Sequence, residues 1–210
     1  MCVEFYLDAM EMQHVLEDIA RRSGGSFRAK DAAEAGVHPR DLYALRDEGF
    51  LVELSRGVYR LADAEMSPYL DLVAVSQRSP RGSICLNSAL SFWDLTDEVP
   101  AEVHLAVPRG SHRPRISYPP VRVHVFAAGT FELGRERVRI ESGEEIQVYS
   151  PERSVVDAVR LRGRVGTGVA YEALRRYLRR PEASAGELLR LARRLRAGGP
   201  MADALEVLTG

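Results

Sequence analysis

The pattern of small and apolar residues in AAEAGVHPRDLYALRDEG, residues 32–49, constrains the fold of this chain most strongly. Ala32 is small enough to let two helices pack closely, and Gly36 can adopt the positive φ that a sharp turn between them needs. Leu42 and Leu45 lie three positions apart, on one face of a helix, where they would hold the second helix against the first. The spacing therefore predicts a helix-turn-helix.

The neighbouring segments predict the other parts of a winged helix. Apolar residues at helical spacing indicate a helix over residues 11–22. The run LVELSRGVYRL, residues 51–61, is typical of two strands joined by the tight turn Ser55-Arg56-Gly57, and this hairpin would form the wing. Residues 1–62 are thus predicted to be a winged helix-turn-helix domain. Residues 39–48 would be the recognition helix, which enters the major groove of DNA.

Burial of the two leucines leaves the opposite face of the recognition helix for DNA. Arg40 lies in the first turn and is the predicted reader of a base, because arginine can bind guanine through two hydrogen bonds. Tyr43 would contact a base methyl group or a phosphate. Arg56, at the wing tip, would contact a phosphate or the adjacent minor groove. The remaining candidate DNA contacts are basic or histidine side chains of the same domain: Arg28, Lys30, His38, Arg46 and Arg60.

The charge balance of this domain leaves a second interpretation open. Six basic and six acidic side chains between residues 28 and 60 cancel, whereas DNA binding needs bases that cluster on one surface. Winged helices also serve as protein-interaction modules. In that interpretation His38 is a turn residue, and Arg46 flanks the core.

A polar linker at residues 62–67 precedes a part of mixed composition. Helices are predicted at residues 67–77, 86–94, 151–159, 168–180, 184–196 and 200–208. Strands are predicted at residues 102–107 and 121–126, and on both sides of Ser142-Gly143 within residues 136–149. Residues 67–210 are therefore expected to form a mixed domain with a small sheet and several helices. The fold class of the whole chain is predicted to be α+β.

Residues 67–210 contain no convincing catalytic or metal-binding motif. Lys30 is the only lysine, so a nuclease core that needs a lysine beside metal-binding carboxylates is not expected there. Gly82-Ser83 followed by Asp94-Leu95-Thr96-Asp97 approaches a nucleotidyltransferase motif, but a spacing of three places the carboxylates on opposite faces of a strand. Gly166-Thr167-Gly168 is a weak anion-binding motif and fits a helix-entry loop better.

The histidines of this part lack the spacing of metal ligands, and surface positions are expected for them: His104, His112 and His124. No metal, cofactor or enzymatic activity is therefore predicted for the chain.

Arginines dominate the carboxyl-terminal region. Residues 160–196 hold eleven arginines against three glutamates, which suggests an acidic partner or solvated helix faces. The loop PRGSHRPR, residues 108–115, is also basic and could bind phosphates or an acidic protein surface. The candidate anion or partner surface comprises Arg109, Arg113, Arg115, Arg175, Arg176 and Arg179.

The sequence favours a cytoplasmic location. Uncharged stretches reach about a dozen residues, too few to cross a bilayer. The amino-terminal segment MCVEFYLDAMEM is acidic, unlike a secretory signal. Cys2 and Cys85 are accordingly expected to be free thiols, and no membrane partner is expected.

Three blocks of the sequence, taken in order, carry a resemblance to a known family. They are GSFRAKDAAEAGVHPRDLYALRDEGFLVELSRGVYRL, SICLNSALSFWDLTDEVPAEVHLAVPRG and VYSPERSVVDAVR. Together they resemble the AbiEi-type antitoxins of abortive-infection, type IV toxin–antitoxin systems, over about residues 20–180.

The resemblance implies a winged-helix transcriptional regulator that binds operator DNA at inverted repeats and represses its own operon. It also implies a carboxyl-terminal domain that counteracts a toxin with a nucleotidyltransferase fold, without a stable complex. The family's DNA contacts lie in the recognition helix and the wing, which here match Arg40, Tyr43 and Arg56. The resemblance transfers no catalytic residue.

Two alternatives stay open at the level of sequence. The chain could be a stand-alone DNA-binding regulator whose second domain senses a ligand or a protein. It could also be an enzyme with an unrecognised site in residues 67–210. A neighbouring gene for a nucleotidyltransferase-like protein would favour the antitoxin, and metal-dependent activity of the purified protein would favour the enzyme.

Overall fold

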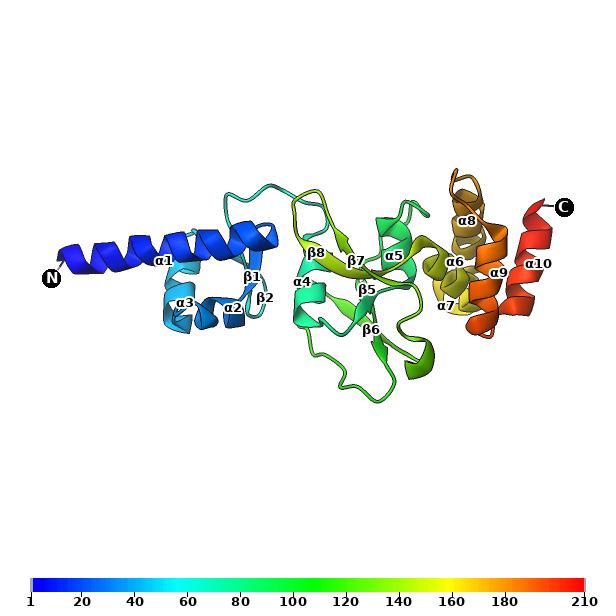
Figure 1. The fold of residues 1–210 in the computed structure, drawn as a ribbon, viewed down its shortest axis with the longest axis horizontal. Coiled ribbons are helices and arrows are strands. Elements are labelled where there is room, and N and C mark those ends of the chain that lie inside the picture. The colour runs from blue at the N-terminus through cyan, green and yellow to red at the C-terminus, as the bar shows by residue number, and fades with distance from the viewer. Residues whose placement is uncertain (1, 210) are drawn as a thin grey trace. The chain divides into compact units, whose positions relative to one another are not determined.

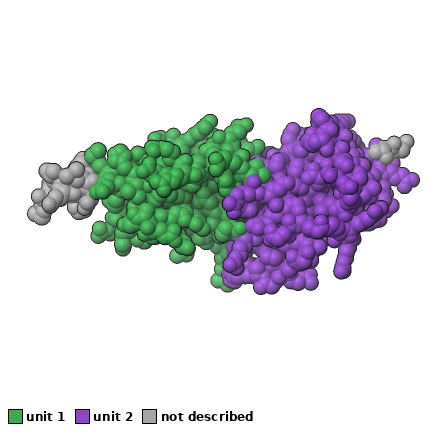
Figure 2. Space-filling view, in the orientation of Figure 1, with its two compact units in different colours: residues 1–80, 115–120, 138–146 green, residues 81–114, 121–137, 147–210 purple. Residues whose placement is uncertain are grey.

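The computed structural model describes residues 2–209 and the side chains of residues 10–208. The chain divides into two compact units, each discontinuous in sequence and coloured separately in Figure 2. Unit 1 comprises Met1–Pro80, Arg115–Pro120 and Val138–Ile146. Unit 2 comprises Arg81–Pro114, Val121–Arg137 and Gln147–Gly210. A division in sequence at residues 62–67 stays a prediction.

Unit 1 contains the predicted helix-turn-helix and wing (Figure 1). Its elements are α1 (Cys2–Ser23), β1 (Ser26–Arg28), α2 (Ala29–Glu34), α3 (Pro39–Asp47), β2 (Leu51–Ser55), β3 (Val58–Leu61) and α4 (Leu70–Arg78). The three strands form an antiparallel sheet in the order β1-β3-β2. The helix predicted to begin at Ser67 begins at Leu70, and the Ser67 hydroxyl accepts a hydrogen bond from the Tyr69 amide, at 3.2 Å.

The leucine spacing produces the predicted core of the winged helix. Leu42 and Leu45 are buried together with Ala32 and with the wing residues Leu51 and Tyr59. The turn between α2 and α3 contains Gly36 with a φ of 91°, a conformation that glycine adopts without steric cost. The structure thus confirms the predicted close packing of the two helices at Ala32, the turn between them at Gly36 and the anchoring of the second helix by Leu42 and Leu45.

The tip of the β7–β8 hairpin, Val138–Ile146, completes unit 1. The backbone of Gly143 lies so close to Gly24 that a Cβ atom at Gly24 would collide with it. Glu144, at this tip, is fully buried. The contact joins segments that lie far apart in sequence, so no local pattern predicts it.

The strands of unit 2 and of the β7–β8 hairpin form a mixed sheet that is accompanied by helices (Figure 1). The predicted α+β class is therefore confirmed. The strands are β4 (Ser83–Ile84), β5 (Val103–Pro108), β6 (Val121–Phe126), β7 (Arg135–Arg139) and β8 (Glu145–Tyr149). Their order is β6-β5-β4-β8-β7. The pairs β5–β6 and β4–β8 are parallel, and β4–β5 is antiparallel.

The helices of unit 2 pack around one central helix. They are α5 (Leu86–Phe92), the 3-10 turn η1 (Ala128–Thr130), α6 (Pro151–Arg160), α7 (Arg162–Val165), α8 (Thr167–Leu178), α9 (Ala185–Arg194) and α10 (Gly198–Thr209). Helix α6 contacts α5, α7, α8, α9 and α10. Strand β4 and helix α7 were not predicted, because each is too short to show a periodic pattern.

Helix α6 is buried on nearly all sides, since each residue from Arg153 to Val159 is buried, and one of these residues is an arginine. Arg153 is fully buried, donates to Asp157 at 2.8 Å and to the Thr130 carbonyl at 2.8 Å, and stacks on the Tyr149 ring at 4.3 Å. These contacts satisfy the charge and the donors of a group that would otherwise be costly to bury. Cys85, in the same core, is a free thiol, and burial raises its pKa. The side chain of Cys2 lies outside the described residues.

The predicted surface positions are wrong for two of the three histidines. His104 on β5 and His124 on β6 are buried, and their ring centroids lie 5.0 Å apart. In the parallel register, Ala106 is opposite His124 and His104 is opposite Arg122, so both histidines lie on the same face of the sheet. His112 is exposed, as predicted.

No helix in the described part of the chain is both long and apolar enough to span a membrane.

Candidate nucleic-acid interface

Helix α3 begins at a histidine cap. His38 is the N-cap residue, and its Nδ1 accepts a hydrogen bond from the backbone N–H of Arg40, at 3.1 Å. Pro39 follows in the first turn, where its missing N–H costs nothing. Because Nδ1 is the acceptor, neutral His38 carries its proton on Nε2. That nitrogen is the one left to donate to a phosphate.

The outward face of α3 carries the predicted reader of DNA bases. Leu42 and Leu45 are 1% and 4% exposed, whereas the Arg40 side chain is 82% exposed, with the Asp41 carboxylate 3.6 Å away. Tyr43 is 50% exposed. The leucines of this helix are therefore buried, and its first-turn arginine is exposed beside one carboxylate.

Arg46 joins the recognition helix to the wing. Its Nη1 donates to Glu53 Oε2 on β2 at 3.1 Å, and its Nε and Nη2 donate to Asp47. The guanidinium also lies 5.3 Å from the centre of the Tyr43 ring, within the range of a cation–π contact. Two carboxylates therefore compete with any phosphate for Arg46.

The wing turn is held from two sides. Gly57 has a φ of 73°, its N–H donates to Glu53 Oε1 at 3.0 Å, and its carbonyl accepts from the Ala29 N–H at 2.9 Å. Glu53 therefore serves both the turn and Arg46, a connection that the sequence did not indicate. Arg56 lies at the tip with an exposed side chain.

The other predicted contacts at the start of α2 carry carboxylate partners. Arg28 donates to Asp31 through Nε and Nη2, at 3.0 and 2.5 Å. This hydrogen bonding raises the pKa of Arg28 and lowers that of Asp31. Lys30 is 74% exposed and lies 3.4 Å from Glu34. Both cations lie at the surface, but their charge is partly balanced.

The structure contradicts the predicted DNA contact of Arg60. Its side chain is 4% exposed, and its Nε donates to the buried Glu144 carboxylate at 3.0 Å. Its other donors bind the carbonyl groups of Ala64 and Glu65. Arg60 lies on β3, the central strand of the small sheet. It is a structural residue that joins the sheet to the hairpin tip.

The candidate anion surface does not form as one group. Arg176 is 23% exposed and is bound by Glu172 and Asp97, with Asp94 3.8 Å away, so it braces its own unit instead of offering a free charge. Arg175 is exposed but donates to Glu172 at 2.6 Å. Of the six candidates, four are exposed and have no carboxylate partner among the described residues: Arg109, Arg113, Arg115 and Arg179. Arg115 belongs to unit 1, and the others belong to unit 2.

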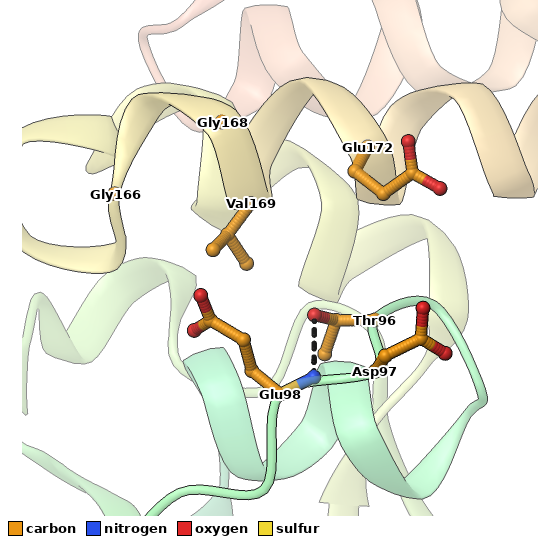
Figure 3. A pocket seen from close by; sticks show the side chains of 7 residues that line it. All are labelled: Thr96, Asp97, Glu98, Gly166, Gly168, Val169 and Glu172. Carbon is orange, nitrogen blue, oxygen red and sulfur yellow. Dashed lines mark hydrogen bonds between the residues drawn. The ribbon is translucent and has the colours of Figure 1, made fainter.

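A cavity of about 550 Å³ in unit 2 lies beside the first turn of α8 (Figure 3). Its lining is acidic and comprises Thr96, Asp97, Glu98, Gly166, Gly168, Val169 and Glu172. Three carboxylates around the glycine-containing loop oppose anion binding, so the helix-entry interpretation of residues 166–168 is the better one. No group of three or more histidine, cysteine or acidic residues is placed to hold a metal ion in the described part.

Comparison with known proteins agrees with this geometry. Residues 14–62 match the family model described as transcriptional regulator, AbiEi antitoxin. A crystal structure of the Rv2827c protein from Mycobacterium tuberculosis has a similar fold, with a TM-score of 0.52 and 21% identity over 92% of this chain and 79% of that one. No curated protein matches the chain. The segment that forms the helix-turn-helix and the wing, residues 14–62, is thus similar to the AbiEi antitoxin family of transcriptional regulators.

Proposed function

We propose that this protein is an antitoxin that represses its own operon by binding inverted repeats in operator DNA. The observation that carries the proposal is the geometry of α3, in which Leu42 and Leu45 are buried while Arg40 is 82% exposed. An arginine in the first turn of a recognition helix is placed to bind guanine in the major groove. Tyr43 and Arg56 add contacts from the helix and from the wing.

The rest of the chain would counteract a toxin with a nucleotidyltransferase fold, without forming a stable complex. In this proposal residues 1–62 bind DNA and residues 67–210 carry the antitoxin activity, both in the cytoplasm. Arg109, Arg113 and Arg179 are exposed arginines of unit 2 without a carboxylate partner among the described residues, and such a domain could offer them to an anionic partner.

Operator binding by the full-length chain tests the proposal. The probe is a duplex from upstream of the protein's own gene, compared with a scrambled duplex of equal length and composition. Arg40→Ala should weaken operator binding by about 1–3 kcal/mol, because it removes a base contact, and should change scrambled-duplex binding much less. Arg21→Ala is the matched control, because Arg21 is an exposed arginine on α1 that lies 3.0 Å from Asp18. It should change binding to neither duplex.

Equal losses of binding on the two duplexes would rule out the base-reading role of Arg40.

Co-expression with the product of a neighbouring nucleotidyltransferase-like gene tests the antitoxin activity. Operator binding without any protection from that product would indicate a stand-alone regulator.

A further inference from the structure

We infer that Arg78 and Arg115 extend the wing into a second contact surface for DNA phosphates; the inference rests on the proposed function. Arg78 is exposed and ends helix α4. Its Nη1 donates to the backbone carbonyl of Arg56 at the wing tip, at 3.0 Å. Its Nη2 donates to the backbone carbonyl of Arg115, at 3.4 Å.

One guanidinium therefore brings two distant segments together. Its two terminal nitrogens thus contact the wing turn and the segment that begins at Arg115. All three segments belong to unit 1. The side chains of Arg56, Arg78 and Arg115 are all exposed.

The charge of this cluster is not balanced within the protein. Among the described residues, none of the three guanidinium groups has a carboxylate partner. Other arginines of unit 1 do have one, since Arg28 pairs with Asp31 and Arg60 with Glu144. Arg56 and Arg115 are exposed cations whose backbone carbonyls both contact the Arg78 guanidinium, so an anion could contact all three residues and balance their charge.

Double-stranded DNA is the occupant that the observations favour. The cluster is continuous with the wing, where Arg56 is the proposed phosphate contact, and a DNA backbone offers phosphates in a row. Tyr118, in the same segment, is 61% exposed and carries a hydroxyl that can donate to a phosphate. The sequence pattern had placed Arg115 with Arg109 and did not single out Arg78, because only the fold brings these arginines together.

The salt dependence of binding by full-length variants tests this surface. Arg115→Gln should weaken binding severalfold on both operator and scrambled duplexes. It should also make the slope of log Kobs against log salt shallower by about one, because one fewer counterion is released. Arg22→Gln is the matched control, because it removes the same charge from an exposed arginine in the last turn of α1, and it should leave the slope unchanged.

Arg78→Lys separates charge from geometry. Lysine keeps the positive charge but cannot donate to both carbonyl groups in a fixed plane, so binding should weaken while the slope stays as in the wild type. An unchanged slope in Arg115→Gln, or an equal change in Arg22→Gln, would overturn the inference. Loss of protection from the toxin with unchanged DNA binding would also overturn it, because the surface would then bind protein.

The outcomes for Arg40 and Arg115 are distinguishable. If the wild type binds DNA and Arg40→Ala loses operator preference, but Arg115→Gln binds normally, the inference fails and the proposed function stands. If the wild type binds no DNA, both fail.

Discussion

Arg60 and Glu144 form an ion pair in which both side chains are nearly inaccessible, at 4% and 0% exposure. The pair is held by further hydrogen bonds from Arg60 to backbone carbonyls and from the Ser142 hydroxyl to Glu144. Removal of one partner leaves the other charge buried and unpaired, which costs more than the pair contributes. The residue predicted to touch DNA is thus a residue on which the stability of unit 1 depends.

Arg60→Ala should lower the free energy of unfolding by about 3–5 kcal/mol, because it strands the Glu144 carboxylate. Urea denaturation followed by circular dichroism measures the loss. Arg139→Ala is the control: its ion pair with Glu145 is exposed, so the loss should be about 0–1 kcal/mol. The double variant Arg60→Met, Glu144→Gln should recover part of the stability that Arg60→Ala loses. If Arg60→Ala lowers the free energy of unfolding as little as Arg139→Ala does, the role of the ion pair is contradicted.

At the scale of elements, the parallel pairing of β5 and β6 creates a buried pair of histidines. His104 Nδ1 and His124 Nε2 have no hydrogen-bond partner. Burial, followed by the charge of nearby Arg122, lowers the pKa of His104. Burial is the largest cause that lowers the pKa of His124 to about 4, and His104, Arg164 and Arg122 lower it further. The Glu102 carboxylate, in contrast, raises the pKa of His104.

This pairing predicts a pH dependence of stability. The unfolded chain takes up histidine protons near pH 6.5, whereas folded His124 stays neutral until about pH 4. Because the unfolded state binds more protons in this window, the free energy of unfolding should fall as the pH decreases from about 6.5 toward 4, by up to ~1.4 kcal/mol per pH unit for one histidine. The contribution is fully present above about pH 6.5.

Urea midpoints between pH 7.5 and 5.5 measure this dependence. His124→Asn should make it shallower, since one titrating group of the unfolded state is removed. His112→Asn, at an exposed position, should leave it unchanged. An equal slope in His124→Asn and the wild type would show that the buried pair does not control the pH response.

At the scale of the whole molecule, repression and protection should be separable by point variants. The Arg40 side chain is 82% exposed, so its loss should leave the fold intact. Full-length Arg40→Ala should lose repression of a reporter driven by the operon promoter and keep protection against the toxin. Growth under toxin induction and reporter output, measured in the same cells at equal protein levels, check the prediction.

Point variants are preferable to truncation for this test because unit 1 is discontinuous. A cut at residues 62–67 would separate Arg60 from Glu144 and Arg56 from Arg78, and would damage both fragments. If protection disappears together with DNA binding in Arg40→Ala, the two activities are not separate.

The sequence by itself determined the parts that depend on near neighbours. The positions of Leu42 and Leu45, the glycine turn and the hairpin all follow from residues a few positions apart, because helix periodicity and turn chemistry are local properties. Hence the helix-turn-helix, the wing, the exposed Arg40 and the α+β class were predicted correctly.

Only the tertiary structure decided which charged groups are free to act. Arg60 donates a hydrogen bond to the carboxylate of Glu144, 84 positions away in sequence. Arg78 donates one to the backbone carbonyl of Arg115, 37 positions away. Arg176 likewise donates a hydrogen bond to Asp97, 79 positions away in sequence. Whether an arginine is available to a phosphate depends on whether a carboxylate lies within a few ångströms, and for Arg60 and Arg176 distant segments supply Glu144 and Asp97 only after the chain has folded.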